Sequence, residues 1–191
     1  MGMKITQGKV GFVVEVKTHL QNIVLSVTYE GVEFDLEKLA RSLEGARYDP
    51  EVFPGIAYKS EDPQASFLIF ASGKMNCVGA RSMNDAKLAI KRLTKKLRNS
   101  GIKVKSEPKV KVQNIVASFD FGREFDLERI ARTFENTEYE PEVFPGLVFR
   151  LDEPKVVVLL FVSGKGVCAG AKSMTDIKTA GAKILKLLKQ R

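Results

Sequence analysis

The sequence is dominated by an internal repeat. Residues 31–83 align with residues 122–174 without a gap, and 27 of the 53 aligned positions are identical. Both copies contain the stretches EFDLE, PEVFPG and SGK in the same order. The stretch QNIV, at 21–24 and again at 113–116, extends the repeat upstream at an offset of 92 rather than 91 residues. Two tandem copies favour a molecule with an internal pseudo-twofold axis, suited to a partner of similar symmetry.

The repeat divides the chain into three parts. We expect a first repeat at 16–105, a second repeat at 106–191, and an N-terminal extension at 1–15, in which we find no repeat equivalent and no role. The composition, 44% hydrophobic and 28% charged, is that of a globular protein. The longest apolar run, Val156–Val162, is much shorter than the roughly 20 residues that cross a bilayer. The sequence therefore predicts a soluble intracellular protein with no membrane partner.

The hydrophobic pattern within each copy predicts the order strand, helix, strands, helix. Residues 21–29 alternate apolar and polar side chains as a strand does, and so does the equivalent stretch of the second copy. Asp35 and Asp126 are suited to cap short helices, and Ser82 and Ser173 begin longer helices that carry one apolar stripe each. This order indicates an α+β fold with mostly antiparallel strands. Two long helices cover only one side of such a sheet.

Side-chain parity in the strands predicts what lies on the other side of the sheet. Asn22, Val24 and Ser26 point away from the helices if their apolar neighbours point towards them. Leu68 and Phe70 then point outwards as well, which leaves an apolar patch of the kind that marks an interface. Two alternatives stay open: the sheet curls and buries these residues itself, or the chain dimerises through them.

Two further features are less specific. Cys77 and Cys168 occupy equivalent positions on the helix side, which favours buried thiols over a disulfide or a metal site. Residues 85–105 contain eight basic residues and one acid. This segment is either a solvated helix face or a surface for an anionic partner, which would be nucleic acid or an acidic protein.

The motifs QNIV, Y-x-PEVFPG, SGK and GA-x-S, each present twice, resemble the TATA-box-binding protein family over about residues 16–190. The short PEVFPG loops of both copies are similar to those of archaeal members. The resemblance implies a saddle: a curved ten-stranded antiparallel sheet with two long and two short helices on its convex face. It also implies a general transcription factor that binds A·T-rich TATA-box DNA in the minor groove and recruits transcription factor B and, indirectly, RNA polymerase. Such a protein is cytoplasmic and nucleoid-associated in archaea, or nuclear in eukaryotes.

The resemblance further implies roles for individual residues. Four phenylalanines intercalate and kink the DNA: Phe53, Phe70, Phe144 and Phe161. Minor-groove and base contacts fall on Asn22, Val24, Ser26, Leu68, Asn76, Val78, Asn114, Val116, Ser118, Leu159, Val167 and Ala169. Phosphate contacts fall on Lys59, Lys74, Arg81, Arg150, Lys155, Lys165 and Lys172. Transcription factor B contacts fall on Glu140, Glu142 and Val143.

This sequence departs from the family at a few of these positions. Val78 and Ala169 stand where the family often has threonine, which implies fewer hydrogen bonds to bases and a relaxed sequence stringency. Gln64 stands where the second copy has Lys155, which removes one phosphate contact from the first half. The basic segment 85–105 resembles the surface that acidic regulators use in the family.

Two other functions remain as alternatives. The first alternative is an accessory domain of a nucleic-acid enzyme, since similar halves occur in DNA glycosylases and some ribonucleases H. The second is a scaffold that binds only protein. The enzymatic alternative is disfavoured because His19 is the only histidine and the acidic residues do not have metal-ligand spacing. We expect no catalytic residues, no metal and no cofactor.

Overall fold

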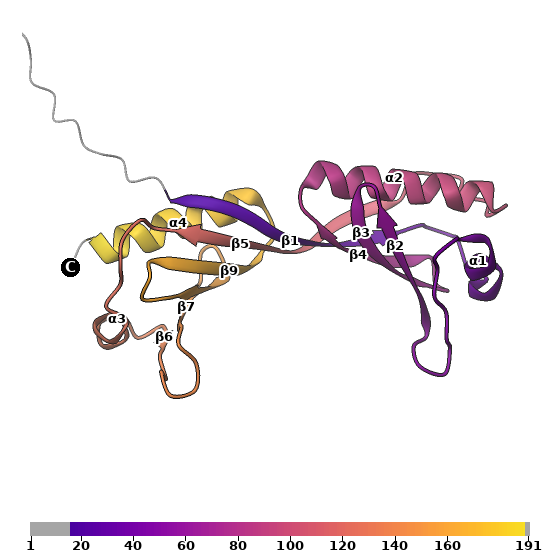
Figure 1. The fold of residues 1–191 in the computed structure, drawn as a ribbon. Coiled ribbons are helices and arrows are strands. Elements are labelled where there is room, and N and C mark those ends of the chain that lie inside the picture. Colours follow the sequence, from indigo (N-terminus) through magenta and orange to yellow (C-terminus); the bar gives the residue numbers. More distant parts are fainter. Residues whose placement is uncertain (1–15, 190–191) are drawn as a thin grey trace, which may run out of the picture.

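A computed structural model of the chain describes residues 16–189, in which nine strands form a single curved antiparallel sheet (Figure 1). The extension expected at 1–15 lies outside the described residues. The order across the sheet is β2-β3-β4-β1-β5-β9-β8-β7-β6. The strands are β1 (Lys17–Thr28), β2 (Gly55–Glu61), β3 (Gln64–Phe70), β4 (Lys74–Ala80), β5 (Lys109–Asp120), β6 (Thr137–Glu138), β7 (Leu147–Leu151), β8 (Val156–Leu160) and β9 (Lys165–Ala171).

The two long strands β1 and β5 form the centre of the sheet and relate its two halves. They pair antiparallel, and Ile23 lies opposite Ile115, its equivalent in the repeat. The pseudo-twofold axis expected from the repeat therefore passes through this pair. The expected α+β fold with a curved antiparallel sheet is confirmed. Residues 16–189 contain nine strands where the resemblance implies ten, because the first-half counterpart of β6 is only a bridge between Arg47 and Ala57.

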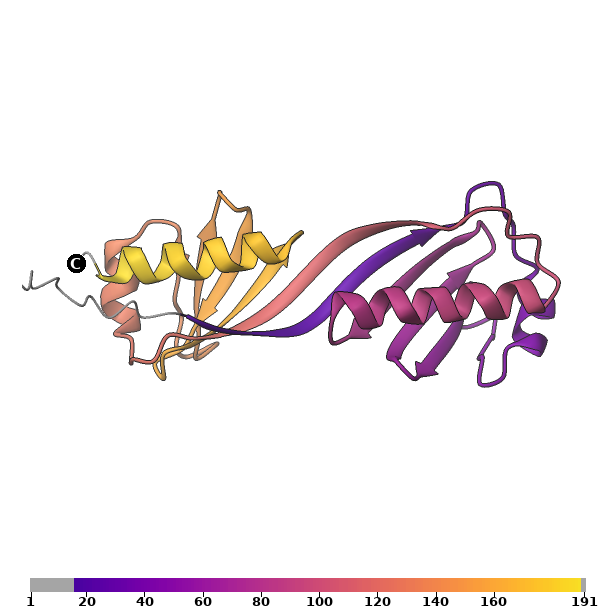
Figure 2. The same ribbon diagram turned by 90° about the horizontal axis from the view of Figure 1, so that it is seen from above.

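Four helices accompany the sheet, and the two long ones lie along the same face (Figures 1 and 2). The helices are α1 (Leu36–Ser42), α2 (Met83–Asn99), α3 (Leu127–Thr133) and α4 (Met174–Lys189). The predicted caps are confirmed: the Asp35 carboxylate accepts a hydrogen bond from the Lys38 amide at 3.0 Å, and Asp126 caps α3 in the same way. The Asp85 and Asp176 amides donate to the hydroxyls of Ser82 and Ser173.

The core consists of two clusters, one in each half, between the sheet and the helices. In β1 every second residue from Ile23 to Val27 is buried in the first cluster, as parity predicts for Ile23, Leu25 and Val27. Cys77 and Cys168 are fully buried free thiols, and burial raises the pKa of each to about 11. The prediction of buried thiols in place of a disulfide is thus confirmed.

Residues 16–189 contain neither a candidate membrane-spanning helix nor a candidate metal site. No helix there is long and apolar enough to cross a membrane. No three side chains of histidine, cysteine, aspartate or glutamate in this part of the chain are grouped so that they could hold a metal ion.

Candidate nucleic-acid interface

The face of the sheet opposite the long helices, here called the underside, carries a continuous layer of half-buried side chains. The register aligns them across strands: Leu68 lies opposite Asn76, and Asn76 lies opposite Ser26. The second half repeats this row with Leu159, Val167 and Ser118. Within residues 16–189, none of these side chains belongs to either core cluster. On the underside lie all the predicted groove residues: Asn22, Val24, Ser26, Leu68, Asn76, Val78, Asn114, Val116, Ser118, Leu159, Val167 and Ala169.

The four predicted wedge phenylalanines form two pairs, one in each half. The ring centroids of Phe53 and Phe70 are 5.8 Å apart, and those of Phe144 and Phe161 are 6.1 Å apart. In each pair one ring comes from the PEVFPG loop and the other from the end of β3 or the residue after β8. All four rings keep part of their surface exposed, and Phe144 is 39% exposed.

The glycine that ends each PEVFPG loop makes room for its phenylalanine pair. A Cβ added at Gly55 would lie 2.9 Å from Cε1 of Phe53, and one added at Gly146 would lie 2.6 Å from Cε1 of Phe144. Real Cβ atoms do not approach other atoms so closely. The glycines therefore allow the loop ring to pack against the strand ring, a constraint that the sequence motif alone does not reveal.

Asn22 and Asn114 are held in one orientation by the backbone. The Oδ1 atom of Asn22 accepts a hydrogen bond from the Gly79 amide at 3.0 Å, and that of Asn114 accepts one from the Gly170 amide at 2.8 Å. An amide N–H is only a donor, so the side-chain oxygen must be the atom that faces it. Each Nδ2 group then points away with its two protons, and neither donates to another described residue.

The two glycines that hold the asparagines lie at β-bulges. The register of β1 with β4 shifts between Ile23 and Leu25, and that of β5 with β9 shifts at the equivalent place. Gly79 has φ +83° and Gly170 has φ +97°, in the left-handed region that favours glycine. Bulges re-aim local groups, and here each turns an amide towards an asparagine beside the pseudo-twofold axis.

The serines of the underside have glutamine partners that the motifs alone do not indicate. Nε2 of Gln113 donates to the Ser26 hydroxyl at 2.8 Å, and Nε2 of Gln21 donates to the Ser118 hydroxyl at the same distance. Each pair links β1 to β5 across the pseudo-twofold axis. The glutamines belong to the repeated QNIV motif, so their pairing with the opposite serine was accessible once β1 and β5 were placed side by side.

The seven predicted phosphate-binding side chains are all exposed. They are Lys59, Lys74, Arg81, Arg150, Lys155, Lys165 and Lys172. Strand parity places Lys59 and Lys74 on the underside, together with their second-half equivalents. Two of the seven have protein partners: Arg150 forms an ion pair with Glu138 at 3.2 Å, and Nζ of Lys172 donates to the carbonyl oxygen of Gln113.

The outer edges of the underside differ in charge between the two halves. Arg47 and Glu138 are equivalent residues, 91 positions apart, and each pairs with the residue two positions before the equivalent cation, Lys59 or Arg150. The first half therefore has two cations, Arg47 and Lys59, at this edge, and neither forms an ion pair with another described residue. In the second half the Glu138 carboxylate neutralises Arg150. This asymmetry was not among the sequence-based expectations.

The residues predicted to contact transcription factor B lie on the second PEVFPG loop. Glu140 and Glu142 are exposed, and the Val143 side chain is 80% exposed. The amides of Val143 and Phe144 both donate to the Glu140 carbonyl oxygen, which shapes the loop as one tight turn. The first loop has the same turn around Asp49.

Comparison with known proteins identifies the family. A family model described as "Transcription factor TFIID (or TATA-binding protein, TBP)" matches this chain twice, at residues 17–100 and 109–191. The chain belongs to the TATA-binding protein family. The two matched segments correspond to the two copies of the repeat.

Individual members of the family are similar along nearly the whole chain. A TATA-box-binding protein of Methanocaldococcus jannaschii is 49% identical over 178 residues, which cover 93% of this chain and 97% of that protein. One from Pyrococcus furiosus is 47% identical over 174 residues, which cover 91% of each. The solved structure titled "Methanococcus jannaschii TBP" superimposes with a TM-score of 0.85 at 50% identity, covering 93% of this chain and 99% of that one.

Proposed function

We propose that this chain is a general transcription factor without enzymatic activity, which binds A·T-rich TATA-box promoter DNA in the minor groove with its underside and bends it. The observation that carries the proposal is the underside itself. It combines an apolar layer, two oriented amide donors beside a pseudo-twofold axis, and an aromatic pair at each outer end. A DNA duplex has matching twofold symmetry in its backbone, so both halves can contact it in the same way.

The phenylalanine pairs act as wedges. Inserting apolar side chains between base steps from the minor groove is the established way in which this family kinks DNA. Unstacking costs about a few kcal/mol per step, and the bent duplex offsets this cost by contacting more protein surface. Phe53 with Phe70, and Phe144 with Phe161, are packed and partly exposed in the free chain. Their packing in pairs and their partial exposure support this role.

The asparagines supply the preference for A·T pairs. In the minor groove an A·T pair offers only acceptors, whereas a G·C pair adds an amino donor. Asn22 and Asn114 present donors, because their oxygens are occupied by Gly79 and Gly170. A guanine amino group would meet a donor and the flanking valines, with no acceptor to receive it. Flexible TA steps lower the bending cost and add indirect readout.

The exposed lysines and arginines along the underside position the duplex through its phosphates. Such contacts carry no sequence information and weaken as salt rises. Val78 and Ala169 provide no hydrogen-bonding side chain, so shape and flexibility of the DNA carry more of the recognition and the sequence stringency is relaxed.

Partners complete the proposed assembly. Glu140, Glu142 and Val143 form an exposed acidic loop that binds transcription factor B, which in turn recruits RNA polymerase. The basic outer face of α2 binds acidic regulators. The exposed helix side of the molecule stays accessible while the underside is covered by DNA.

A mobility-shift titration with A·T-rich and G·C-rich duplexes, at one stated salt concentration, tests the proposal. We expect preferential binding of the A·T-rich duplex, together with bending in a fluorescence-transfer assay. Binding of neither duplex favours a protein-only scaffold. Equal binding of both without bending contradicts the proposal and favours an accessory domain of a nucleic-acid enzyme.

The proposed contact with transcription factor B is tested by Glu142→Arg. We expect weaker ternary assembly with transcription factor B and nearly unchanged binary DNA binding, because the side chain is exposed on the loop. Glu51→Arg, at the equivalent position of the first loop, is the matched control and leaves ternary assembly intact. If native gels show no loss of ternary complex for Glu142→Arg, this contact is assigned wrongly.

A further inference from the structure

The row of groove residues in each half of the underside continues into a side chain that the motifs did not indicate. In the second half, His19 of β1 lies directly opposite Ser118 of β5. In the first half, Lys111 of β5 lies directly opposite Ser26 of β1. His19 and Lys111 are 92 positions apart, the offset that relates the two QNIV motifs, so they are equivalent residues.

Pairing and burial both place these two side chains on the underside. Residues directly opposite each other in an antiparallel pair point to the same face, and the two serines belong to the underside. The next residues along the strands, Leu20 and Val112, pack against the core clusters on the helix side. Because side chains alternate along a strand, His19 and Lys111 point the other way. Both are exposed.

His19 and Lys111 also lie at an edge of the sheet. β4 pairs with β1 only from Ile23 onwards, and β9 pairs with β5 only from Ile115 onwards. The preceding stretch of each long strand, which contains His19 or Lys111, therefore has a strand neighbour on one side only within residues 16–189. In each half, the row of groove residues thus ends at one of these two side chains.

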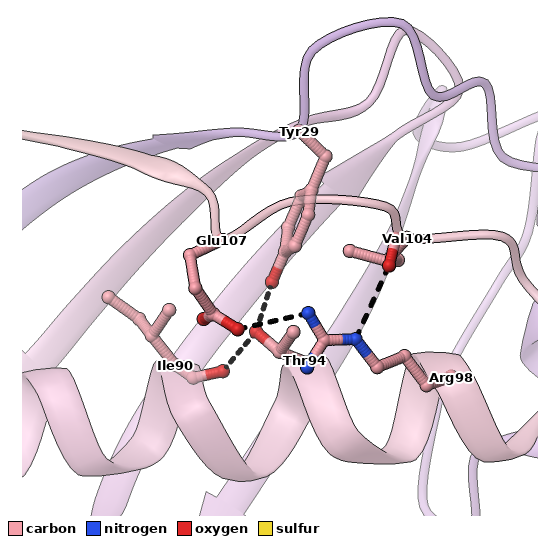
Figure 3. Close-up of polar contacts among 6 residues, drawn as sticks. All are labelled: Tyr29, Ile90, Thr94, Arg98, Val104 and Glu107. Atoms are coloured by element: carbon pink, nitrogen blue, oxygen red, sulfur yellow. Dashed lines mark hydrogen bonds and ion pairs between the residues drawn. The ribbon is translucent and has the colours of Figure 1, made fainter.

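Contacts between α2 and the segment that leads to β5 hold the first-half edge in place (Figure 3). The Arg98 guanidinium pairs with the Glu107 carboxylate at 2.9 Å and donates from Nε to a backbone carbonyl oxygen of the same segment at 3.4 Å. Lys109, the first residue of β5, pairs with Glu30. These contacts occupy both carboxylates, and Lys111 forms no ion pair with another described residue.

The titratable side chains that face His19 come from β1, β5 and β9. Lys17 stands two positions before His19 on β1 and lies opposite Asp120 of β5. Lys165 of β9 lies opposite Asp120 on the other side, so the one carboxylate stands between two lysines in the register. Within residues 16–189, the His19 imidazole forms no hydrogen bond and no ion pair, because only the backbone of His19 takes part in such contacts.

We propose that His19 contacts a DNA phosphate only when its imidazole is protonated, whereas Lys111 makes the equivalent contact in the first half at any physiological pH. This inference rests on the proposed binding of a duplex by the underside. The minor groove is about 6 Å wide and is bounded by the two phosphate backbones, so side chains at the edge of a surface that fills it meet phosphates rather than bases. Histidine is the side chain that ordinarily changes its charge between about pH 5 and 8, and lysine stays charged there.

DNA binding is then coupled to the uptake of a proton by the second half. A phosphate stabilises the charged imidazole and not the neutral one, so the affinity rises as the pH falls. Each cation that neutralises a phosphate steepens the fall of log affinity with log salt by about 0.9. The protonated chain therefore has one more salt-dependent contact than the neutral one, and that contact belongs to the second half alone.

Binding of a fluorescent TATA-type duplex, titrated over a series of salt concentrations at about pH 5.5 and about pH 8, tests the proposal. For the unaltered chain we expect a salt slope steeper by up to about 0.9 at the lower pH. His19→Gln removes this difference, and because the chain has one histidine, its comparison with the unaltered chain isolates the imidazole. His19→Lys gives the steeper slope at both pH values. Lys111→Gln is the matched variant of the first half: it flattens the slope at both pH values and keeps the difference between them.

Two results would overturn the proposal. The first is agreement between the slopes of the unaltered chain and His19→Gln at both pH values. The second is a His19→Lys slope at the higher pH that is no steeper than that of the unaltered chain. Preference for A·T-rich DNA and bending, measured on the same samples, decide the proposed function separately: their absence in the unaltered chain contradicts that function itself. A difference between the pH values that is lost with His19→Gln, together with a constantly steep slope of His19→Lys, supports the proposal.

Discussion

The two halves of the underside share their shape but not their charge. Both present a phenylalanine pair, a backbone-held asparagine and an apolar row in equivalent places. At the outer edge the first half has two cations without ion-pair partners among the described residues, Arg47 and Lys59, whereas the second half pairs Arg150 with Glu138. The duplication thus supplies contacts that treat both halves of a duplex alike. The divergence of single residues gives the two outer edges different charges, which a fully symmetric site would not have.

The largest expected effect comes from the shared features. Phe144→Ala with Phe161→Ala removes one wedge pair, and Phe53→Ala with Phe70→Ala removes the other. Because the rings are partly exposed, folding survives in both cases. We expect each double variant to reduce the DNA bend in a fluorescence-transfer assay, and to similar extents. An unchanged end-to-end distance for either pair would remove that pair from the wedge assignment.

A smaller effect is expected from the asparagines, again alike in both halves. Asn114→Ala deletes one amide donor and should cost about 1–3 kcal/mol of discrimination against a G·C pair at the contacted position. Asn22→Ala should do the same on the other side of the pseudo-twofold axis. Competition binding between duplexes with single A·T-to-G·C replacements measures this loss of discrimination against G·C pairs. Discrimination that is unchanged in both variants contradicts the role of the amides in base readout.

The smallest effect should separate the halves. Glu138→Gln frees Arg150 for a phosphate, so we expect tighter binding at low salt and a salt slope steeper by about 0.9 for one added contact. Arg47→Gln is the matched variant in the first half and should weaken binding and flatten the slope. The slopes come from affinities measured over a series of salt concentrations. Equal slopes for both variants and the unaltered chain would mean that the edge charges do not reach the duplex.

Much of the fold followed from the sequence, because its signals are local and doubled. Helix caps at Asp35 and Asp126, and the alternation along β1, depend only on neighbouring residues and are confirmed. The strand count did not follow, since one bridge at Arg47 marks the place where the second half has a two-residue strand. Whether such a short pairing counts as a strand depends on backbone geometry that residue types do not specify.

The residues of the candidate site were predicted from the sequence, but the interactions between them were not. The repeat and the family motifs indicate Asn22, Ser26 and Arg150. They do not indicate the Gly79 amide that orients Asn22, the Gln113 side chain that pairs with Ser26, or the Glu138 carboxylate beside Arg150. These contacts join residues far apart in the sequence or across a bulge. They become visible only when the register of the strands is known.

Replacing guanine with hypoxanthine tests the central claim most directly, because an I·C pair lacks the minor-groove amino group of a G·C pair. Three duplexes with one TATA-type core, carrying A·T, G·C or I·C at the central positions, are compared at one salt concentration. Recognition through the minor groove predicts that the I·C duplex binds and bends like the A·T duplex, while the G·C duplex binds much more weakly. An I·C duplex that behaves like the G·C duplex would contradict it.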